Sequence, residues 1–182
     1  MKPDVKPHDH PLLSYSDESI AMPSHIEAAF HEAAHAVVAH TSAYFTLAGT
    51  VSIQNAGTGF ADIGPSRRKL TAAAKPIDAS IDADPQIASE LAIILLAGIE
   101  GEIIAEEQNT TLRADVDRSE PDICFAVEKL EAAKVATDLD VLRGEARERL
   151  EANWSKVERL AQQLIAQGAL PAVDVVDLLN EA

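Results

Sequence analysis

Apolar residues recur at helical spacing along the first strongly patterned stretch of the chain, residues 24–40. Positions three and four apart share one face of an α-helix, and Ser24 is a residue type that caps a first turn. The apolar stripe consists of Ile26, Ala29, Phe30, Ala33, Ala34, Val37 and Val38. The pattern predicts an amphipathic helix that begins after Ser24 and ends near His40.

Two short stretches with β-propensity follow this helix. They are residues 50–53 and 60–63, and residues 54–59 between them are rich in Asn and Gly, which favour a turn. We therefore expect a hairpin or two short sheet strands. From the second stretch to Asp84 the sequence predicts a loop with one weakly helical segment.

The most apolar helix is predicted from Pro85, with Asp84 as its cap, to about Glu107. Its longest apolar run, residues 91–99, indicates a helix buried in the core. The run is too short for a bilayer, whose hydrocarbon core needs about 20 residues, so we expect no membrane span.

Further helices are predicted in the last third of the chain. After a polar break, one helix opens at Pro121 or Asp122. A long, charged, amphipathic helix covers about residues 142–167 and ends at Gly168, a residue type favoured just after the last turn. Pro171 then starts a short final helix.

These elements together predict a mostly α-helical fold with a small β-hairpin or sheet. Aromatic residues make up only 4% of the chain and hydrophobic residues 47%, a balance that favours packed helices over a β-sandwich. Residues 1–22 contain several prolines and scattered charge, and we expect a flexible N-terminal segment without a signal peptide. Residues 23–182 are expected to form one domain.

Charge and cysteine content narrow the classes of function. The formal net charge is −15, so the surface repels phosphate backbones, and we expect no binding to nucleic acid or anionic membranes. Cys124 is the single cysteine, which excludes an internal disulfide and a cysteine zinc cluster. We expect Cys124 to be a small core residue in a protein of the reducing cytoplasm. Any metal must therefore bind histidine and carboxylate side chains.

The candidate chemistry is concentrated in His31-Glu32-Ala33-Ala34-His35, an H-E-x-x-H sequence on the first predicted helix. Residues i and i+4 share one helix face, so both imidazoles can reach one metal ion. Glu32 lies beside the first histidine and can take a proton from water and deliver it to a leaving amine. The motif predicts zinc, bound by His31 and His35, with Glu32 as the catalytic base.

A zinc peptidase needs a third protein ligand and an open fourth position. The extended motif that ends in a third histidine is excluded, because Thr41 stands at that histidine's position and Val38 at the position of its glycine. Glu102 on the central apolar helix is one candidate for the third ligand. An aspartate near the start of the next helix is the other, either Asp122 or, less favoured, Asp117 or Asp115.

Four stretches of the chain, taken in order, carry a family resemblance. They are residues 30–38, residues 51–60, residues 96–102 and residues 121–126. In that order they resemble the H-E-A-G-H-A-V-V motif, the strand–loop–strand, the L-x-G-R-x-A-E motif and the N-D-L-x-x-A motif of the protease domain of FtsH-type AAA+ metalloproteases. With the final helices, the resemblance covers about residues 26–180.

The resemblance implies a zincin-like helical bundle with a small β-hairpin or sheet near the metal. By position, Asp122 matches the family's third zinc ligand, and Glu102 matches an acidic residue that we expect to orient a ligand histidine. An edge strand within residues 51–63 would align the substrate backbone. The chain departs from the family at Ala34, Ile99 and Pro121, where the family has Gly, Arg and Asn.

The function implied is a zinc-dependent endopeptidase that hydrolyses peptide bonds of unfolded proteins or peptides. The chain contains no G-x-x-x-x-G-K-[ST] phosphate-binding loop, so we expect ATP-independent cleavage or a separate ATPase or adaptor that supplies substrates. A homo-oligomer is compatible with the family. The alternative is a non-catalytic module that keeps the fold and the zinc to bind a protein partner, and the intact Glu32 argues against it.

Overall fold

The computed structural model describes residues 25–54 and 57–181. The predicted flexible segment, residues 1–22, and the predicted cap Ser24 lie outside the described residues. The helices are α1 (His25–Thr41), α2 (Arg67–Ala72), α3 (Pro85–Gln108), α4 (Val116–Ala132), α5 (Leu139–Ala152), α6 (Trp154–Gln167) and α7 (Ala172–Asn180). The strands are β1 (Phe45–Ile53), β2 (Gly59–Pro65) and β3 (Ala169–Pro171).

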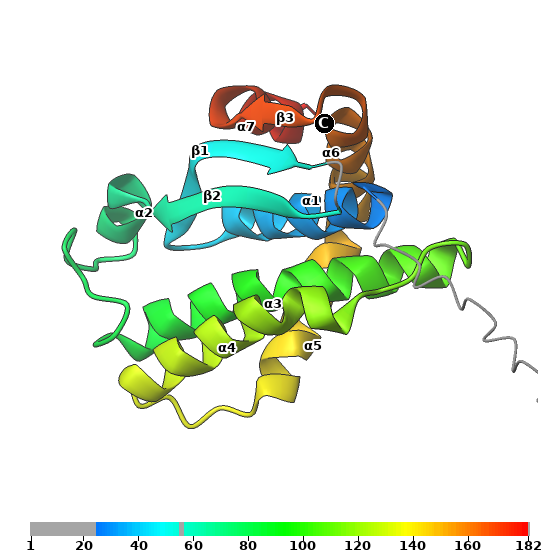
Figure 1. The fold of residues 1–182 in the computed structure, drawn as a ribbon. Coiled ribbons are helices and arrows are strands. Elements are labelled where there is room, and N and C mark those ends of the chain that lie inside the picture. The colour runs from blue at the N-terminus through cyan, green and yellow to red at the C-terminus, as the bar shows by residue number, and fades with distance from the viewer. Residues whose placement is uncertain (1–24, 55–56, 182) are drawn as a thin grey trace, which may run out of the picture.

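Helix α1 lies at the centre of the fold, with the sheet on one side and α3 and α4 on the other (Figure 1). It packs against β1, β2, α3 and α6. Alanines make this crowding possible, because their small side chains let neighbouring backbones approach. On the side of α3, a Cβ atom on Gly101 would lie 2.5 Å from the Cβ atom of Ala34. Consequently almost every residue from Glu27 to Ala39 is buried.

The sheet has the strand order β2-β1-β3, and all pairs are antiparallel. Val51 lies opposite Ala61 and Ile53 opposite Gly59, and the register shifts between Leu47 and Val51. Because β1 is the middle strand, β2 is an edge strand that pairs only with β1 among the described residues. Strand β2 lies on the side of the sheet nearer α3 and α4 (Figure 1).

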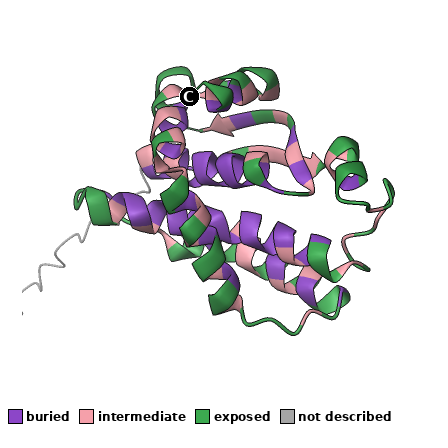
Figure 2. Ribbon diagram, turned by 180° about the vertical axis from the view of Figure 1, so that it is seen from behind, coloured by how far each residue is buried: buried purple, intermediate pink, exposed green. Residues whose placement is uncertain are grey.

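Helix α3 begins as the sequence predicts. The Asp84 side chain accepts hydrogen bonds from the backbone N–H groups of Gln86 and Ile87, and Pro85 occupies the first turn. The middle of α3 is buried, because α1, α4 and α5 pack around it (Figure 2). The apolar run of residues 91–99 therefore lies in the core, as predicted.

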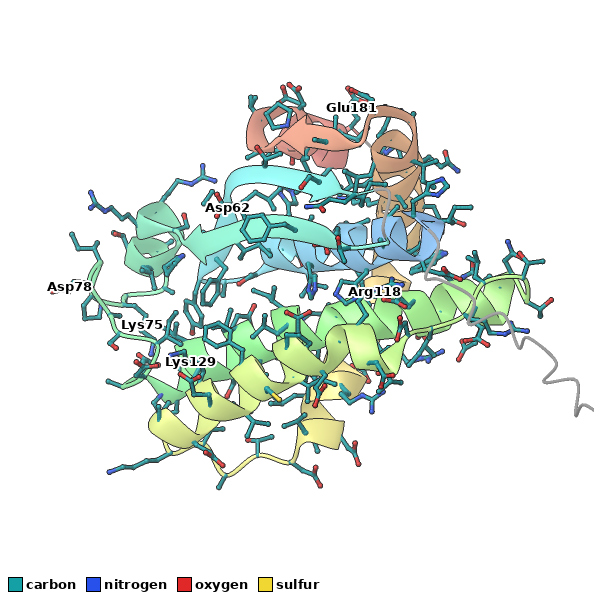
Figure 3. The ribbon with its side chains drawn as sticks, in the orientation of Figure 1. Asp62, Lys75, Asp78, Arg118, Lys129 and Glu181 are labelled. Carbon is teal, nitrogen blue, oxygen red and sulfur yellow. The ribbon has the colours of Figure 1, made fainter. Side chains whose placement is uncertain are left out.

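Two lysines form ion pairs with aspartates of the loop between α2 and α3. Lys75 lies 2.6 Å from the Asp84 carboxylate, and Lys129 at the end of α4 lies 3.0 Å from that of Asp82 (Figure 3). The second pair connects α4 to the loop that leads into α3. Helix α4 itself packs directly against α3, and both helices contribute residues to the site described below.

The predicted fold class is confirmed, since the described residues are mostly helical with a small three-stranded antiparallel sheet. The hairpin is also found, although its strands are longer than the predicted stretches at residues 50–53 and 60–63. Among the described helices, none combines the length and the apolar character needed to cross a bilayer.

The predicted start of α4 is wrong. The helix begins at Val116, because Asp115 acts as its cap and accepts a hydrogen bond from the N–H group of Arg118. Pro121 lies inside the helix, where its missing N–H removes only one internal hydrogen bond. Asp122 therefore projects from the body of α4 and not from its first turn.

The single long helix predicted over residues 142–167 is also wrong. Asn153 leaves the helical conformation with φ −125° and ψ 19°, and its side-chain amide donates to the carbonyl of Arg149. The break lets α5 pack on α3 while α6 packs on α1. The short strand β3 after Gly168 has no counterpart in the predicted elements.

Cys124 is exposed, so its predicted place in the core is wrong. On α4 the buried side is formed by Ala126 and Leu130, with Ile123 packed against the core. Cys124 follows Ile123 by one residue, which turns it about 100° around the helix and towards solvent.

Candidate metal centre

Helix α1 presents His31 and His35 one turn apart on its side facing α3 and α4. Both residues are buried, and their ring centroids lie 4.6 Å apart at an interplanar angle of 81°. The i, i+4 spacing of the H-E-x-x-H sequence thus brings the two imidazoles together as predicted.

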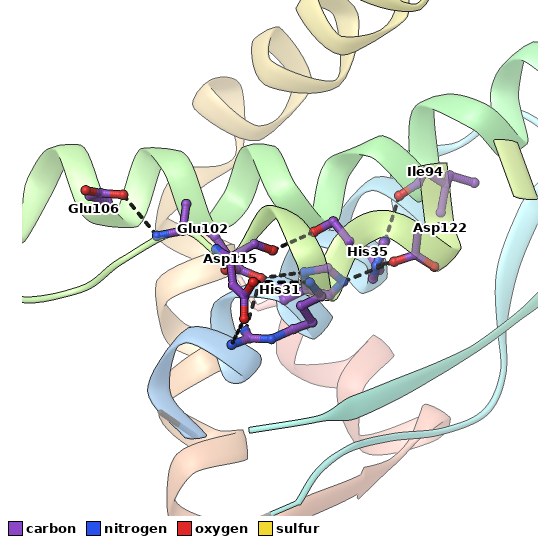
Figure 4. Close-up of polar contacts among 10 residues, drawn as sticks. His31, His35, Ile94, Glu102, Glu106, Asp115 and Asp122 are labelled. Atoms are coloured by element: carbon purple, nitrogen blue, oxygen red, sulfur yellow. Dashed lines mark hydrogen bonds and ion pairs between the residues drawn. The ribbon is translucent and has the colours of Figure 1, made fainter. Parts of the chain in front are cut away.

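Each imidazole is fixed through its Nδ1 atom, as Figure 4 shows. His31 Nδ1 lies 2.7 Å from Glu102 Oε1, and His35 Nδ1 lies 2.7 Å from the carbonyl oxygen of Ile94. A carbonyl or carboxylate oxygen only accepts, so both Nδ1 atoms carry the hydrogen. In the neutral rings both Nε2 atoms therefore keep a lone pair available for a metal.

Asp122 brings the third donor atom. Its Oδ2 lies 3.1 Å from His31 Nε2 and 3.2 Å from His35 Nε2 (Figure 4). Among the described residues, His31, His35 and Asp122 form the one group of three potential metal ligands with donor atoms close enough for a single ion, all within 4.8 Å of one another. The structure thus brings together the three residues that the sequence resemblance named.

The contacts among these three atoms also shift the pKa values of His31 and Asp122. Burial alone would lower the pKa of His31, but hydrogen bonds with Asp122 and Glu102 outweigh it and raise the pKa to about 9. Burial would raise the pKa of Asp122, but its hydrogen bonds with His31 and His35 reverse the effect and lower it. A divalent cation bound by these atoms would displace the proton from His31 Nε2.

Zinc fits the donors and the space that these residues provide. Two imidazole nitrogens and one carboxylate oxygen are typical zinc ligands, and three protein ligands leave a fourth position open. Space is provided by Gly98 on α3, where a Cβ atom would lie 2.6 Å from the Nε2 atoms of both histidines. Any side chain at position 98 would occupy the place where the two rings converge.

Glu32 lies beside the ligands and against the start of β2. Its side chain is buried, and a Cβ atom on Gly59 would lie 2.6 Å from its Oε1 atom. Burial raises the pKa of Glu32, and the nearby charges of His35 and His31 only partly offset this effect. A raised pKa suits a carboxylate that must accept a proton and then release it near neutral pH.

A pocket of about 420 Å³ opens in front of these residues. One end is polar and contains the two histidines, Glu32, Asp122 and Arg118. The other walls are largely apolar, and residues 58–63 along β2 form one side. Apolar wall residues from α3, α4 and β2 include Leu91, Leu95, Phe125, Phe60 and Ile63. The candidate ligands, Glu32 and strand β2 therefore line one and the same pocket.

The other predicted candidates for the third ligand do not join the group. Glu102 holds His31 from the Nδ1 side, as expected for an orienting residue. Asp115 caps α4, and its own N–H donates to Glu102 Oε2 at 2.8 Å. Asp117 is exposed on the first turn of α4. These placements exclude all three from the cluster around the two Nε2 atoms.

Several residues of the site were not predicted as site residues from the sequence. Gly98 and Gly59 leave room around the ligands and the base, and isolated glycines beside a motif could have suggested this. The backbone carbonyl of Ile94 has no signal in the sequence. Arg118 has none either, because a single charged residue in a polar stretch looks like a surface residue.

A scan against protein-family models and a search of curated proteins find no match for this chain. Its function is therefore inferred from the geometry of the site and from the resemblance of its motifs.

Proposed function

We propose that this protein is a zinc-dependent endopeptidase that hydrolyses peptide bonds of unfolded proteins or peptides. One observation carries the proposal: the Nε2 atoms of His31 and His35 converge with Asp122 Oδ2, beside the buried carboxylate of Glu32 and at the polar end of a pocket. No fourth ligand joins these three among the described residues, which favours catalysis over a structural zinc, because structural sites usually fill all four positions with protein ligands.

Packing between α1 and α3 supports the FtsH-type resemblance. That family has Gly at the position of Ala34 and Ala at the position of Gly101. In this chain the two residues face each other, and the space for one methyl group has moved from one helix to the other. An exchange of this kind conserves the volume of the contact, so Ala34 does not argue against the family's helix pairing.

The residues of the site have separable roles in the proposed reaction. Bound zinc would supply Lewis acidity and acidify a water molecule. Glu32 would accept the proton of that water at its carboxylate and deliver it to the leaving nitrogen of the peptide. Glu102 and the Ile94 carbonyl would hold His31 and His35 in place during the reaction, since both accept an Nδ1–H hydrogen bond.

Strand β2 supports an extended peptide as the substrate. Among the described residues β2 is an edge strand with no neighbour on one side, where its backbone N–H and C=O groups are unpaired, and residues 58–63 line the pocket beside Glu32. A substrate strand that adds to this edge would pass its backbone across the metal. Such binding depends more on backbone hydrogen bonds than on side-chain contacts, so it is compatible with unfolded polypeptides of varied sequence.

Delivery of the substrate is a separate part of the proposal. An ATPase or adaptor partner would unfold and deliver folded substrates, while peptides would enter directly. The homo-oligomeric state and the cytoplasmic location stay predictions.

The decisive experiment measures cleavage of a fluorescently labelled, unfolded protein by the zinc-loaded chain. We expect activity that a chelator removes and zinc restores. Glu32→Gln should lower kcat by about 10²- to 10⁴-fold, because it removes the proton acceptor, while zinc content stays at the wild-type level. Glu148→Gln, an exposed glutamate on α5, is the matched control and should leave kcat unchanged.

A folded, zinc-loaded wild-type protein that cleaves no unfolded substrate would contradict the proposal. That result would favour the alternative of a non-catalytic module that binds a protein partner. Equal activity of wild type and Glu32→Gln would also contradict it, because the base would then have no role.

A further inference from the structure

Arg118 is a buried cation at the polar end of the metal pocket. It occupies the first turn of α4, one helical turn before Asp122, so both side chains lie on the same face of the helix. Only 10% of its side-chain surface is exposed. Figure 3 shows it between α1 and the pair formed by α3 and α4. The proposed reaction assigns no task to this residue.

The contacts of Arg118 lead directly to a metal ligand. Its Nη1 atom lies 3.1 Å from Glu102 Oε1, and the same oxygen accepts the Nδ1–H of His31 at 2.7 Å. The other oxygen, Oε2, accepts the N–H of Asp115 at 2.8 Å. Helix α4 thus holds the Glu102 carboxylate at both oxygens and, through it, the ring of His31.

This arrangement has an energetic cost in the protein alone. Nε and Nη2 of Arg118 are shielded and have no hydrogen-bond partner among the described residues. Nη2 lies 3.7 Å from Asp115 Oδ2, which is a charge contact but too long for a hydrogen bond. Apolar residues often stabilise a buried position as well as or better than an ion pair does. Structural support alone therefore does not account for a cation here.

The charge of Arg118 does account for the burial of Glu102. The Glu102 side chain is fully buried, and Arg118 Nη1 lies 3.1 Å from its Oε1 atom. Without that cation an uncompensated carboxylate would be buried beside His31, at a cost that a rearrangement of the Glu102 side chain would relieve.

We infer that Arg118 is a positioning residue of the metal centre, which fixes the Glu102 carboxylate and thereby the orientation of His31. Helix α4 then supplies one ligand, Asp122, directly and supports a second, His31, through Arg118 and Glu102. The inference rests on the metal site of the proposed function, but it does not require peptidase activity.

The test measures the zinc dissociation constant of purified full-length variants by competition with a chelating dye. Arg118→Met keeps the length of the side chain and removes its charge, and we expect zinc binding about 10-fold weaker. Arg118→Lys should lie between wild type and Arg118→Met, because it keeps the charge without the planar fork. The matched control is Arg143→Met, which breaks the pair between Arg143 and Glu100 on the α5 side of α3 and should leave zinc binding unchanged.

Coupling to Glu102 separates positioning from general structural support. Glu102→Gln should weaken zinc binding about 10- to 100-fold. Adding Arg118→Met to Glu102→Gln should cause no further loss, because the guanidinium then has no carboxylate to hold. The metal-free unfolding midpoint of each variant is measured in parallel, since a purely structural residue would lower that midpoint and leave the affinity of the folded fraction unchanged.

Two results would overturn the inference: wild-type zinc affinity in folded Arg118→Met, or an equal loss from Arg118→Met with and without Glu102→Gln. If Arg118→Met does not fold, the zinc affinities of Arg118→Lys and its control Arg143→Lys are compared instead. Equal affinities of these two variants would contradict the inference. Absent cleavage activity with these zinc effects intact would contradict the proposed function alone.

Discussion

Helix α3 carries buried glutamates on two sides, one facing α5 and the other facing the metal centre. On the α5 side, both oxygens of Glu90 pair with Arg149 at 2.7 and 2.9 Å, and Glu100 pairs with Arg143 at 2.7 Å. On the metal side, one oxygen of Glu102 is shared by His31 and Arg118, and two nitrogens of Arg118 lack a hydrogen-bond partner among the described residues.

The two sides of α3 therefore differ in how completely their buried charges are paired. On the α5 side the buried carboxylates are well paired, as expected where charge only connects two helices. On the other side, the Nε2 atoms of His31 and His35 converge with Asp122 Oδ2, and a side chain at Gly98 would fill the space between them. In the proposed function a metal ion binds there, and the following predictions test this contrast from the largest effect to the smallest.

The strongest contrast is between two glycine-to-alanine substitutions. Gly98→Ala places a methyl group 2.6 Å from both Nε2 atoms, so zinc binding should weaken by at least about 100-fold. Gly144 on α5 has nothing within 4 Å of an added Cβ, and Gly144→Ala should stabilise the protein by roughly 0.5–1 kcal/mol with unchanged zinc affinity. Zinc titration and urea unfolding of both variants provide the measurements. Normal zinc binding by Gly98→Ala would show that the metal does not lie between the two rings.

Arg149→Met should reduce stability without affecting the metal. It leaves the buried Glu90 carboxylate without its cation, with only the neutral donors of Ser42 and Ala43 beside it, and the loss of one partner from a buried ion pair costs about 3–5 kcal/mol. Urea unfolding measures the free energy, and zinc titration under folding conditions measures the affinity. A selective loss of zinc affinity in Arg149→Met would contradict the claim that the α5 side of α3 does not affect zinc binding.

The Glu90–Arg149 pair should also make the stability of the protein depend on pH in the acidic range. Burial raises the pKa of Glu90, but the hydrogen bonds and charge of Arg149 outweigh it and lower the pKa below the ordinary 4.5. A depressed folded-state pKa contributes stability that is present above the unfolded value and is lost as the pH falls through the folded value.

The free energy of unfolding of the wild type should therefore decline as the pH is lowered below about 4.5, and that of Arg149→Met should decline less steeply. Urea titrations at a series of acidic pH values test this. If the free energy of unfolding falls with pH in parallel for the two proteins, Arg149 does not lower the pKa of Glu90, and the prediction is wrong.

The smallest effect is expected at the apolar wall of the pocket. Phe125 lines the pocket although 43% of its surface is exposed, so a substrate side chain could cover it. Phe125→Ala should raise KM by roughly 10-fold for peptides with large apolar residues and leave kcat nearly unchanged, because the contact exists before and during the reaction. Val116→Ala, an exposed apolar residue of α4 outside the pocket, serves as the control. Equal KM values for wild type and Phe125→Ala would place substrate binding elsewhere.

The parts of the fold that depend on local pattern could be predicted from the sequence. His31, Glu32 and His35 follow from helical spacing alone, and α3 follows from its cap and apolar run. Asp122 required the resemblance, because residues alone left Glu102, Asp117 and Asp115 open. Which of these carboxylates reaches the two histidines depends on how α3 and α4 pack against α1, and that packing is a long-range property.

The wrong predictions also concern tertiary structure. Pro121 suggested a helix start, but the cap at Asp115 begins α4 earlier. Asn153 lies in a continuous amphipathic pattern, and the break there serves the packing of α5 on α3 and α6 on α1. Arg118 gave no signal because its burial depends on α1 and α3, both distant in the sequence.

The most direct test of the account is a crystal structure of the zinc-loaded protein with an anomalous-difference map at the zinc edge. The account predicts one strong peak about 2.0–2.2 Å from Nε2 of His31, Nε2 of His35 and a carboxylate oxygen of Asp122, with Glu102 hydrogen-bonded to His31 and outside the coordination shell. A peak bound by Glu102 in place of Asp122, or no peak between the two imidazoles, would contradict it.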